Sequence, residues 1–247
     1  MRPMRRTLRA AGLIALAWSM GTAYTRWHSL PSFQGSDASG VFGDAGLAEL
    51  SIVVLGDSSC TGPGLERPQD VWIQRIGREL GQRFHVTLDS FAIGGSKTRD
   101  VLTDQVPKAI ERRYDLAIVS VGGNDMLFGV PIASFHRQLA SIVDALTPST
   151  EAIVLSGVGD MGSIPRLPLL LRWPAHARGR AADRTHARVA ENRPNVFKVP
   201  LWNFAEAFHK DLTLWSPDLF HASSRGHALF AEAALPTITE ALEYLGR

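Results

Sequence analysis

The chain has 247 residues, of which 45% are hydrophobic and 20% are charged, and these ordinary proportions exclude a disordered, collagen-like or low-complexity protein. Its single cysteine, Cys60, excludes an internal disulfide framework and a cysteine-based zinc site. The net charge is +2, but five arginines lie before residue 27, where no acid occurs, so the remainder holds 21 basic residues against 24 acidic ones. Such a mildly acidic body lacks the basic surface that nucleic-acid binding requires.

Residues 1–28 predict a signal peptide or an N-terminal signal anchor. A basic start is followed by an uncharged run from Ala10 to Thr25. The run is shorter than the ~20 apolar residues that span a bilayer, and the arginines before it favour a cytoplasmic N-terminus. We therefore expect an exported protein, either secreted or anchored in the membrane at the cell envelope, and the sequence leaves cleavage of the segment open. The alternative is a buried N-terminal helix of the domain.

Residues 29–46 predict a flexible linker, because they are rich in Ser, Gly, Pro and Asp and show no sustained hydrophobic period. The folded domain is expected over residues 47–247.

The folded domain alternates between strand and helix patterns. Continuous apolar runs predict five strands, over residues 50–55, 85–93, 115–121, 152–158 and 196–201. Helical spacing lies between and after them, over residues 70–80, 99–110, 132–146, 172–193 and 224–245, with Pro107 ending or interrupting the second. Strands separated by helices predict right-handed crossovers and a parallel sheet with helices on both faces. In such sheets the functional site lies at the carboxyl ends of the strands.

Polar motifs follow four of the predicted strands. In chain order they are Gly56-Asp57-Ser58-Ser59, Gly94-Gly95-Ser96, Gly122-Gly123-Asn124-Asp125 and Asp218-Leu219-Phe220-His221. Each motif alone is a common turn composition. Together they supply a serine nucleophile, hydrogen-bond donors, a histidine base and an acid three residues before it, which are the parts that acyl transfer requires.

This ordered set resembles the SGNH (GDSL-type) hydrolase family over about residues 50–245. Members of that family are esterases, lipases, thioesterases and carbohydrate deacetylases. The resemblance implies a flavodoxin-like three-layer α/β/α sandwich with a five-stranded parallel sheet. It implies Ser58 as the nucleophile, His221 as the base and Asp218 as the acid that orients it. The implied oxyanion hole consists of the Ser58 N–H, the Gly95 N–H and the Asn124 side-chain amide.

The sequence departs from the family pattern at three positions. Ser59 stands where the family motif has Leu, Ser90 where many members have Asn, and Ala222 where Pro often follows the histidine. None of these changes removes a catalytic group. Gly94 is an alternative to Gly95 as the donor, and the spacing to the following helix favours Gly95.

The resemblance implies hydrolysis of small-molecule, lipid or glycan esters through an acyl-enzyme, without a metal or cofactor. One alternative is a cell-envelope carbohydrate O-deacetylase or O-acetyltransferase that uses the same triad. A non-catalytic flavodoxin-like binding module is the alternative from a different class. The sequence leaves open the natural substrate, the acyl chain length and the oligomeric state.

Several other residues have a structural interpretation. We expect Cys60 to be a small buried apolar residue, His227 to lie on a helix surface, and Asp57 and Asp125 to cap turns. The arginine-rich segment Arg172–Arg193 is interpreted as a solvated helix face, with a lid or a membrane-surface element as the alternative.

Overall fold

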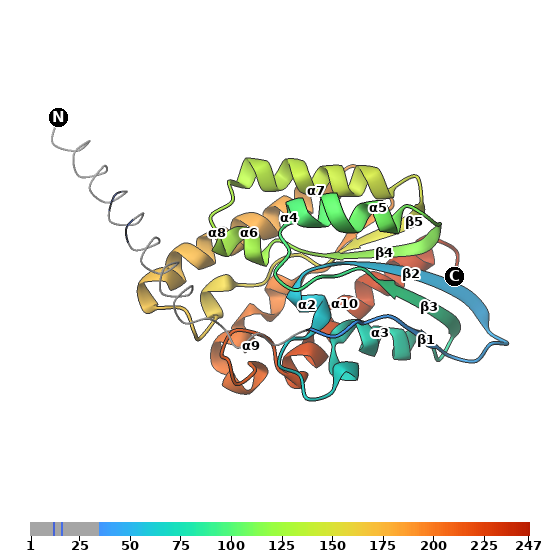
Figure 1. Cartoon of the computed structure of the whole chain (residues 1–247), viewed down its shortest axis with the longest axis horizontal. Helices are drawn as coiled ribbons and strands as arrows, with labels where there is room; N and C mark the ends of the chain where they lie inside the picture. Colours follow the sequence, from blue (N-terminus) through green and yellow to red (C-terminus); the bar gives the residue numbers. More distant parts are fainter. Residues whose placement is uncertain (1–11, 13–15, 17–34) are drawn as a thin grey trace.

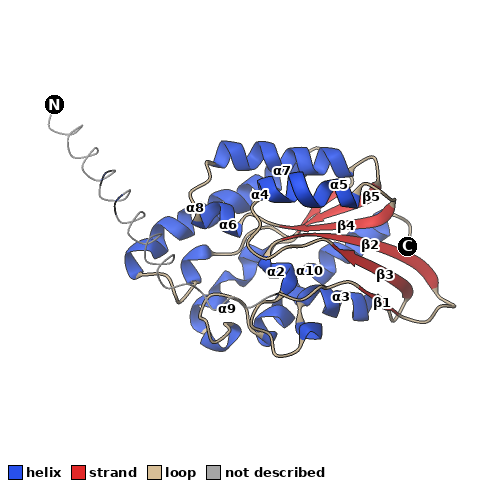
Figure 2. Cartoon of the chain, in the orientation of Figure 1, coloured by secondary structure: helices blue, strands red, loops and turns tan. Residues whose placement is uncertain are grey.

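A computed structural model of the chain describes residues 12, 16 and 35–247. Apart from positions 12 and 16, the predicted signal or anchor segment 1–28 lies outside the described residues. The described body is a central sheet between two layers of helices, which confirms the predicted three-layer α/β/α arrangement (Figures 1 and 2). Within the described ranges, no helix is both long enough and apolar enough to cross a bilayer.

The sheet has six strands in the order β1-β3-β2-β4-β5-β6, and only β1 runs antiparallel to its neighbour. The strands are β1 Gly40–Phe42, β2 Ala48–Gly56, β3 Phe84–Ser90, β4 Tyr114–Ser120, β5 Thr150–Leu155 and β6 Val196–Lys198. The five parallel strands follow the flavodoxin-like order, in which the second strand of the chain lies outside the first. Residues 52–55 of β2 are fully buried, as expected for a strand that is covered on both faces.

The sixth strand corrects two predictions. The sheet was predicted to have five strands and residues 29–46 to be a linker, but Gly40–Phe42 pairs with the edge of β3. The Gln74 side-chain amide also donates to the carbonyls of Ala38 and Ser39, at 2.8 and 3.0 Å. The strand is too short to show an alternating pattern, and its pairing depends on a distant edge. The folded domain therefore begins before Leu47.

Helices cover both faces of the sheet. They are α2 Ser58–Thr61, α3 Trp72–Leu80, α4 Thr98–Asp100, α5 Val106–Ala109, α6 Gly123–Leu127, α7 Ile132–Leu146, α8 Leu169–Ala190, α9 Ala205–Lys210 and α10 Ser224–Tyr244. Helices α3 and α10 pack on one face of the sheet, and α5, α7 and α8 pack on the other (Figure 1). Short 3₁₀ turns lie at Pro68–Asp70, Met161–Ser163, Leu201–Phe204 and Leu212–Leu214. Between α4 and α5, residues Val101–Gln105 form a π-helical turn just before Pro107.

We predict that β1 is required for full stability. A chain shortened to begin at Leu47 loses β1 and leaves the edge of β3 unpaired, whereas one that begins at Gly35 keeps the strand. We expect the shorter chain to lose roughly 2 kcal/mol of unfolding free energy, which lowers Tm by about 4–8 °C for a domain of this size. Thermal melts of the two proteins measure the difference, and equal Tm values would contradict the role of β1.

Candidate active site

The turn after β2 places Ser58 at the start of a helix. The strand ends at Gly56, where a side chain is excluded because a Cβ would lie 2.3 Å from the Ser120 carbonyl oxygen. Asp57 then caps α2, as predicted, by accepting a hydrogen bond from the Ser59 N–H at 2.9 Å. Ser58 is thus the first residue of the helix, where backbone N–H groups have no partner within the helix. The Ser58 N–H therefore has no partner within α2.

Asp218 and His221 form a hydrogen-bonded pair in the loop before α10. The His221 ring donates through Nδ1 to Asp218 Oδ2 at 2.7 Å. The other carboxylate oxygen accepts from the N–H groups of Phe220 and His221, each at 2.9 Å. Burial opposes ionisation of Asp218, but these hydrogen bonds outweigh it and hold the pKa below its ordinary value. An ionised Asp218 fixes the proton on Nδ1 and leaves Nε2 of His221 able to accept another.

Asn124 and Gly95 come from neighbouring turns that are tied together. Asn124 lies in α6, after β4, and its side-chain amide donates to the Ser96 carbonyl at 3.0 Å. Gly95 has φ of 84°, so its backbone conformation, rather than space, selects glycine there. Asp125 accepts from the N–H and the hydroxyl of Thr98, at 2.9 and 3.0 Å. Asp125 thus has the structural role that was predicted for it, and the backbone that its carboxylate binds belongs to the loop that carries Gly95.

Gln105 is a positioning residue that the sequence analysis missed. Its buried side chain accepts from the Gly56 N–H at 2.8 Å and donates to the Gly56 carbonyl at 2.9 Å. The same amide lies 3.1 Å from the Ser96 hydroxyl. Gln105 therefore connects the turn before Ser58 to the loop of Gly95. In the sequence, Pro107 indicates that the helix near Gln105 is irregular, but nothing indicates that the Gln105 side chain bonds Gly56.

Three of the five predicted site residues meet at one pocket. A cavity of about 180 Å³ is lined by Ser58, Asn124 and His221. Asp218 lies behind His221, and Gly95 lies on the exposed loop beside Asn124 rather than in the pocket lining. Among the described residues, no group of three or more His, Cys, Asp or Glu side chains is arranged to hold a metal ion.

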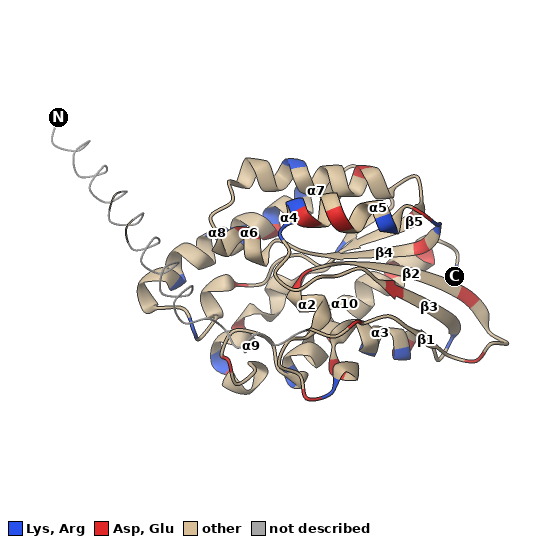
Figure 3. Ribbon diagram, viewed as in Figure 1, with Lys and Arg blue, Asp and Glu red and all other residues tan. Residues whose placement is uncertain are grey.

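The remaining sequence predictions have mixed outcomes. Cys60 is buried, as predicted, and burial raises the pKa of its thiol to about 12. His227 was predicted on a helix surface and is instead buried in the pocket wall. The prediction of a solvated arginine face fails at Arg178, whose guanidinium donates to the carbonyls of Met126 and Val130. Elsewhere, basic and acidic residues are mixed over both helical layers (Figure 3).

Comparisons with known proteins agree on one family. A model of the GDSL-like Lipase/Acylhydrolase family matches residues 54–229. A GDSL-like esterase of Mycobacterium tuberculosis is 26% identical over 200 residues, which are 78% of this chain and 63% of that protein. The chain therefore spans less than two-thirds of the length of this relative.

Solved structures share the fold at low sequence identity. The crystal structure of TesA has a TM-score of 0.65 at 21% identity and covers 77% of this chain and 99% of its own. Axe2, an acetylxylan esterase of Geobacillus stearothermophilus, has a TM-score of 0.61 at 19% identity and covers 78% of this chain and 95% of its own. At such identities the likeness concerns the fold.

We predict that ionisation of Asp57 destabilises the protein. Burial raises the pKa of Asp57 to about 6 from its ordinary value of 3.8, although hydrogen bonds from Ser59 oppose the shift. Between these values the folded state binds more protons than the unfolded state, so stability falls as pH rises through this window. Asp57→Asn keeps a capping oxygen but cannot ionise. Relative to wild type, it should gain up to about 3 kcal/mol between pH 4 and pH 7.

Denaturant unfolding of both proteins across this pH range measures the gain. A stability difference that does not change with pH would contradict the raised pKa of Asp57.

Proposed function

Because the chain belongs to the GDSL-like lipase/acylhydrolase family, we propose that it is a serine hydrolase that cleaves carboxylic esters through an acyl-enzyme. One observation carries the proposal: Ser58, at a helix N-terminus, lines the same pocket as Asn124 and as His221, whose ring is held by a buried aspartate. This combination is required for nucleophilic acyl transfer and has no evident use in a passive binding module.

The acid–base pair activates the serine. The Ser58 hydroxyl is a weak nucleophile at neutral pH, so it needs a base to remove its proton as it attacks the ester carbonyl. The Nε2 atom of His221 takes that proton, and the carboxylate of Asp218 stabilises the imidazolium that results. His221 then gives the proton to the departing alcohol oxygen. In the second half of the reaction His221 takes a proton from the water that attacks the acyl-enzyme. It then gives this proton to the Ser58 oxygen as the acid is released.

The proposed oxyanion hole has three donors, of which Ser58 and Asn124 line the pocket and Gly95 lies on the neighbouring loop. They are the N–H groups of Ser58 and Gly95 and the side-chain amide of Asn124. An amide nitrogen has two hydrogens. Asn124 uses one on the Ser96 carbonyl, at 3.0 Å, and keeps the other for the substrate oxygen. The contact with Ser96 thus orients the donor before any substrate arrives.

A carbohydrate O-deacetylase is the second candidate, because the fold resembles that of an acetylxylan esterase. It uses the same serine and histidine and differs only in what the pocket and its surroundings bind. We also propose export to the cell envelope, which rests on the basic start and the apolar run of residues 1–28. Membrane attachment through that segment is part of the same proposal.

We predict that Ser58 is the residue that forms the acyl-enzyme. A fluorophosphonate probe should label wild type at Ser58, as located by mass spectrometry of the labelled peptide. Ser58→Ala should lose both labelling and the hydrolysis of aryl esters. Ser59→Ala is the matched control, because its hydroxyl bonds to Ser120 at 2.7 Å rather than serving as nucleophile, and it should still be labelled. Labelling of a different serine in wild type would end the assignment.

We predict that Asn124 acts mainly on the transition state. Asn124→Ala should lower kcat by about 10²–10³ with little change in KM, because the negative charge on the oxygen develops during the reaction. Asn124→Asp should be at least as damaging, since it places a negative charge beside the oxyanion. Steady-state kinetics and thermal melts of both variants test this. A folded Asn124→Ala enzyme with near-normal kcat would remove Asn124 from the site.

A further inference from the structure

The cavity at Ser58 continues inward as far as α10. On that helix His227, Phe230 and Ala234 line the cavity at three- and four-residue spacing, so they share one face. Val199, just after β6, and Trp72 line it as well. Ala234 is only 1% exposed, which places that end of the cavity deep in the protein. The cavity therefore extends inward from Ser58 to a buried end at Ala234.

Several of the polar groups that line the inner part of this cavity have hydrogen-bond partners within the protein. The hydroxyl of Ser120 lies 2.7 Å from the hydroxyls of both Ser59 and Ser156. His227 accepts from the Trp72 N–H through Nδ1 at 3.4 Å, and burial lowers its pKa to about 3, so the ring is neutral. The rest of the inner lining is aliphatic or aromatic, including Phe230 and Ala234. A sugar placed there would lose its hydrogen bonds to water, whereas a hydrocarbon chain would gain by burial.

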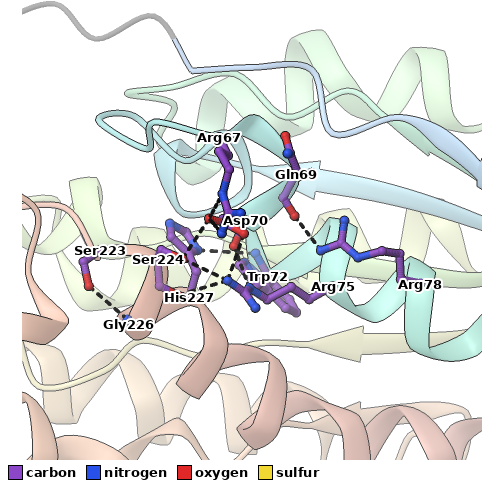
Figure 4. Close-up of polar contacts among 10 residues, drawn as sticks. All are labelled: Arg67, Gln69, Asp70, Trp72, Arg75, Arg78, Ser223, Ser224, Gly226 and His227. Carbon is purple, nitrogen blue, oxygen red and sulfur yellow. Dashed lines mark hydrogen bonds and ion pairs between the residues drawn. The ribbon is translucent and has the colours of Figure 1, made fainter.

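The inner wall of the cavity is fixed by a buried carboxylate. Asp70 accepts from the Arg75 guanidinium at 3.1 Å and from the Ser224 hydroxyl at 2.9 Å (Figure 4). These bonds join α3, which carries Trp72, to the start of α10, which carries His227. Both side chains are therefore held in place without a ligand.

The outer wall is fixed by a second carboxylate. Asp160, in the loop after β5, accepts from the rings of His176 and His209 at 2.8 and 2.7 Å. The loop is thereby bonded to both α8 and α9. With both walls held, the cavity is preformed, and binding of an apolar chain needs little rearrangement.

The size of the cavity, and the side on which the alcohol leaves and water enters, indicate which part of the ester the cavity binds. An engineered cavity of about 150 Å³ in another protein accommodates benzene. The whole site, including the space beside Ser58, has about 180 Å³ and therefore accommodates an acyl group of at most roughly six to eight carbon atoms, counted from the carbonyl carbon. The alcohol must leave and water must enter on the same side of the carbonyl, which requires a path to solvent. The end of the cavity at Ala234 is buried, whereas Ser58 and His221 are partly exposed, so solvent reaches the carbonyl from the side of Ser58. The acyl chain therefore lies inward, and the alcohol lies outward.

We propose that this cavity is an acyl-chain pocket for linear acyl groups of up to about six to eight carbons, with Ala234 setting its length. The proposal rests on the proposed ester hydrolysis and decides between its two candidates, because a deacetylase has no use for such a pocket. The substrate class is therefore medium-chain acyl esters. The alcohol part of the ester lies outside the cavity, at the protein surface.

The test is kcat/KM for p-nitrophenyl esters from acetyl to palmitoyl. For wild type we expect a rise of about fourfold per methylene up to six to eight carbons, followed by a fall. Ala234→Leu should move the optimum to shorter chains and lower the octanoyl-to-acetyl ratio at least tenfold. Ala228→Leu, on the same helix but outside the pocket lining, is the matched control and should keep the wild-type profile.

A second variant guards against misfolding of the first. Phe230→Ala enlarges the pocket and should move the optimum to longer chains. Calorimetry on Ser58→Ala gives a readout that needs no turnover: octanoate should bind more tightly than butyrate by at least tenfold.

Three results would overturn the proposal. The first is an acetyl optimum in wild type. The second is a chain-length profile that Ala234→Leu and Phe230→Ala leave unchanged. The third is that these two variants change the preferred alcohol of the ester rather than the preferred acyl chain. Each of these leaves ester hydrolysis standing. Failure of Ser58 to react with a short fluorophosphonate would instead remove the hydrolase function itself, and the acyl pocket with it.

Discussion

The position of Ser58 depends on how β2 ends at Gly56. There β2 runs so close to β4 that a side chain would collide with the Ser120 carbonyl, and the Asp57 N–H bonds that carbonyl at 3.1 Å. The side chain of Gln105 satisfies both backbone groups of Gly56, so the strand ends without an unpaired buried donor or acceptor. These contacts fix the turn that carries Ser58, and none of them involves a side chain of the proposed catalytic residues.

Hydrogen bonds between side chains also connect the carboxyl ends of the other strands. Hydroxyls of Ser59, Ser120 and Ser156 form a chain across the ends of β2, β4 and β5. Asp125 and Gln105 add bonds to the loop after β3, which carries Gly95. Most of these groups are buried, where an unpaired polar atom is costly, so the arrangement is specified as a network rather than pair by pair. The proposed oxyanion hole therefore depends on residues outside it, such as Asp125 and Gln105.

The sequence predicted the parts of this protein that are encoded locally. Strands such as residues 50–55 are buried on both faces and appear as continuous apolar runs. The family motifs marked Ser58, Asn124 and His221, which line the pocket. The strand Gly40–Phe42 was missed because its pairing needs the edge of β3. His227 was misplaced because a histidine on a helix looks the same whether its face meets water or Trp72. The role of Gln105 could not be predicted, because it depends on a contact 49 residues away along the chain.

The short spacing of Asp218 and His221 separates chemistry from selectivity. Both members of the pair come from one loop, and the carboxylate also bonds the backbone of that loop, so the pair forms a self-contained unit. Much of the pocket wall comes from other segments, namely the loop after β5, α9 and the middle of α10. Mutations can therefore remodel those walls while the proton-transfer unit stays intact. Divergence toward new esters, in nature or in the laboratory, can proceed on this scaffold without rebuilding its reactive centre.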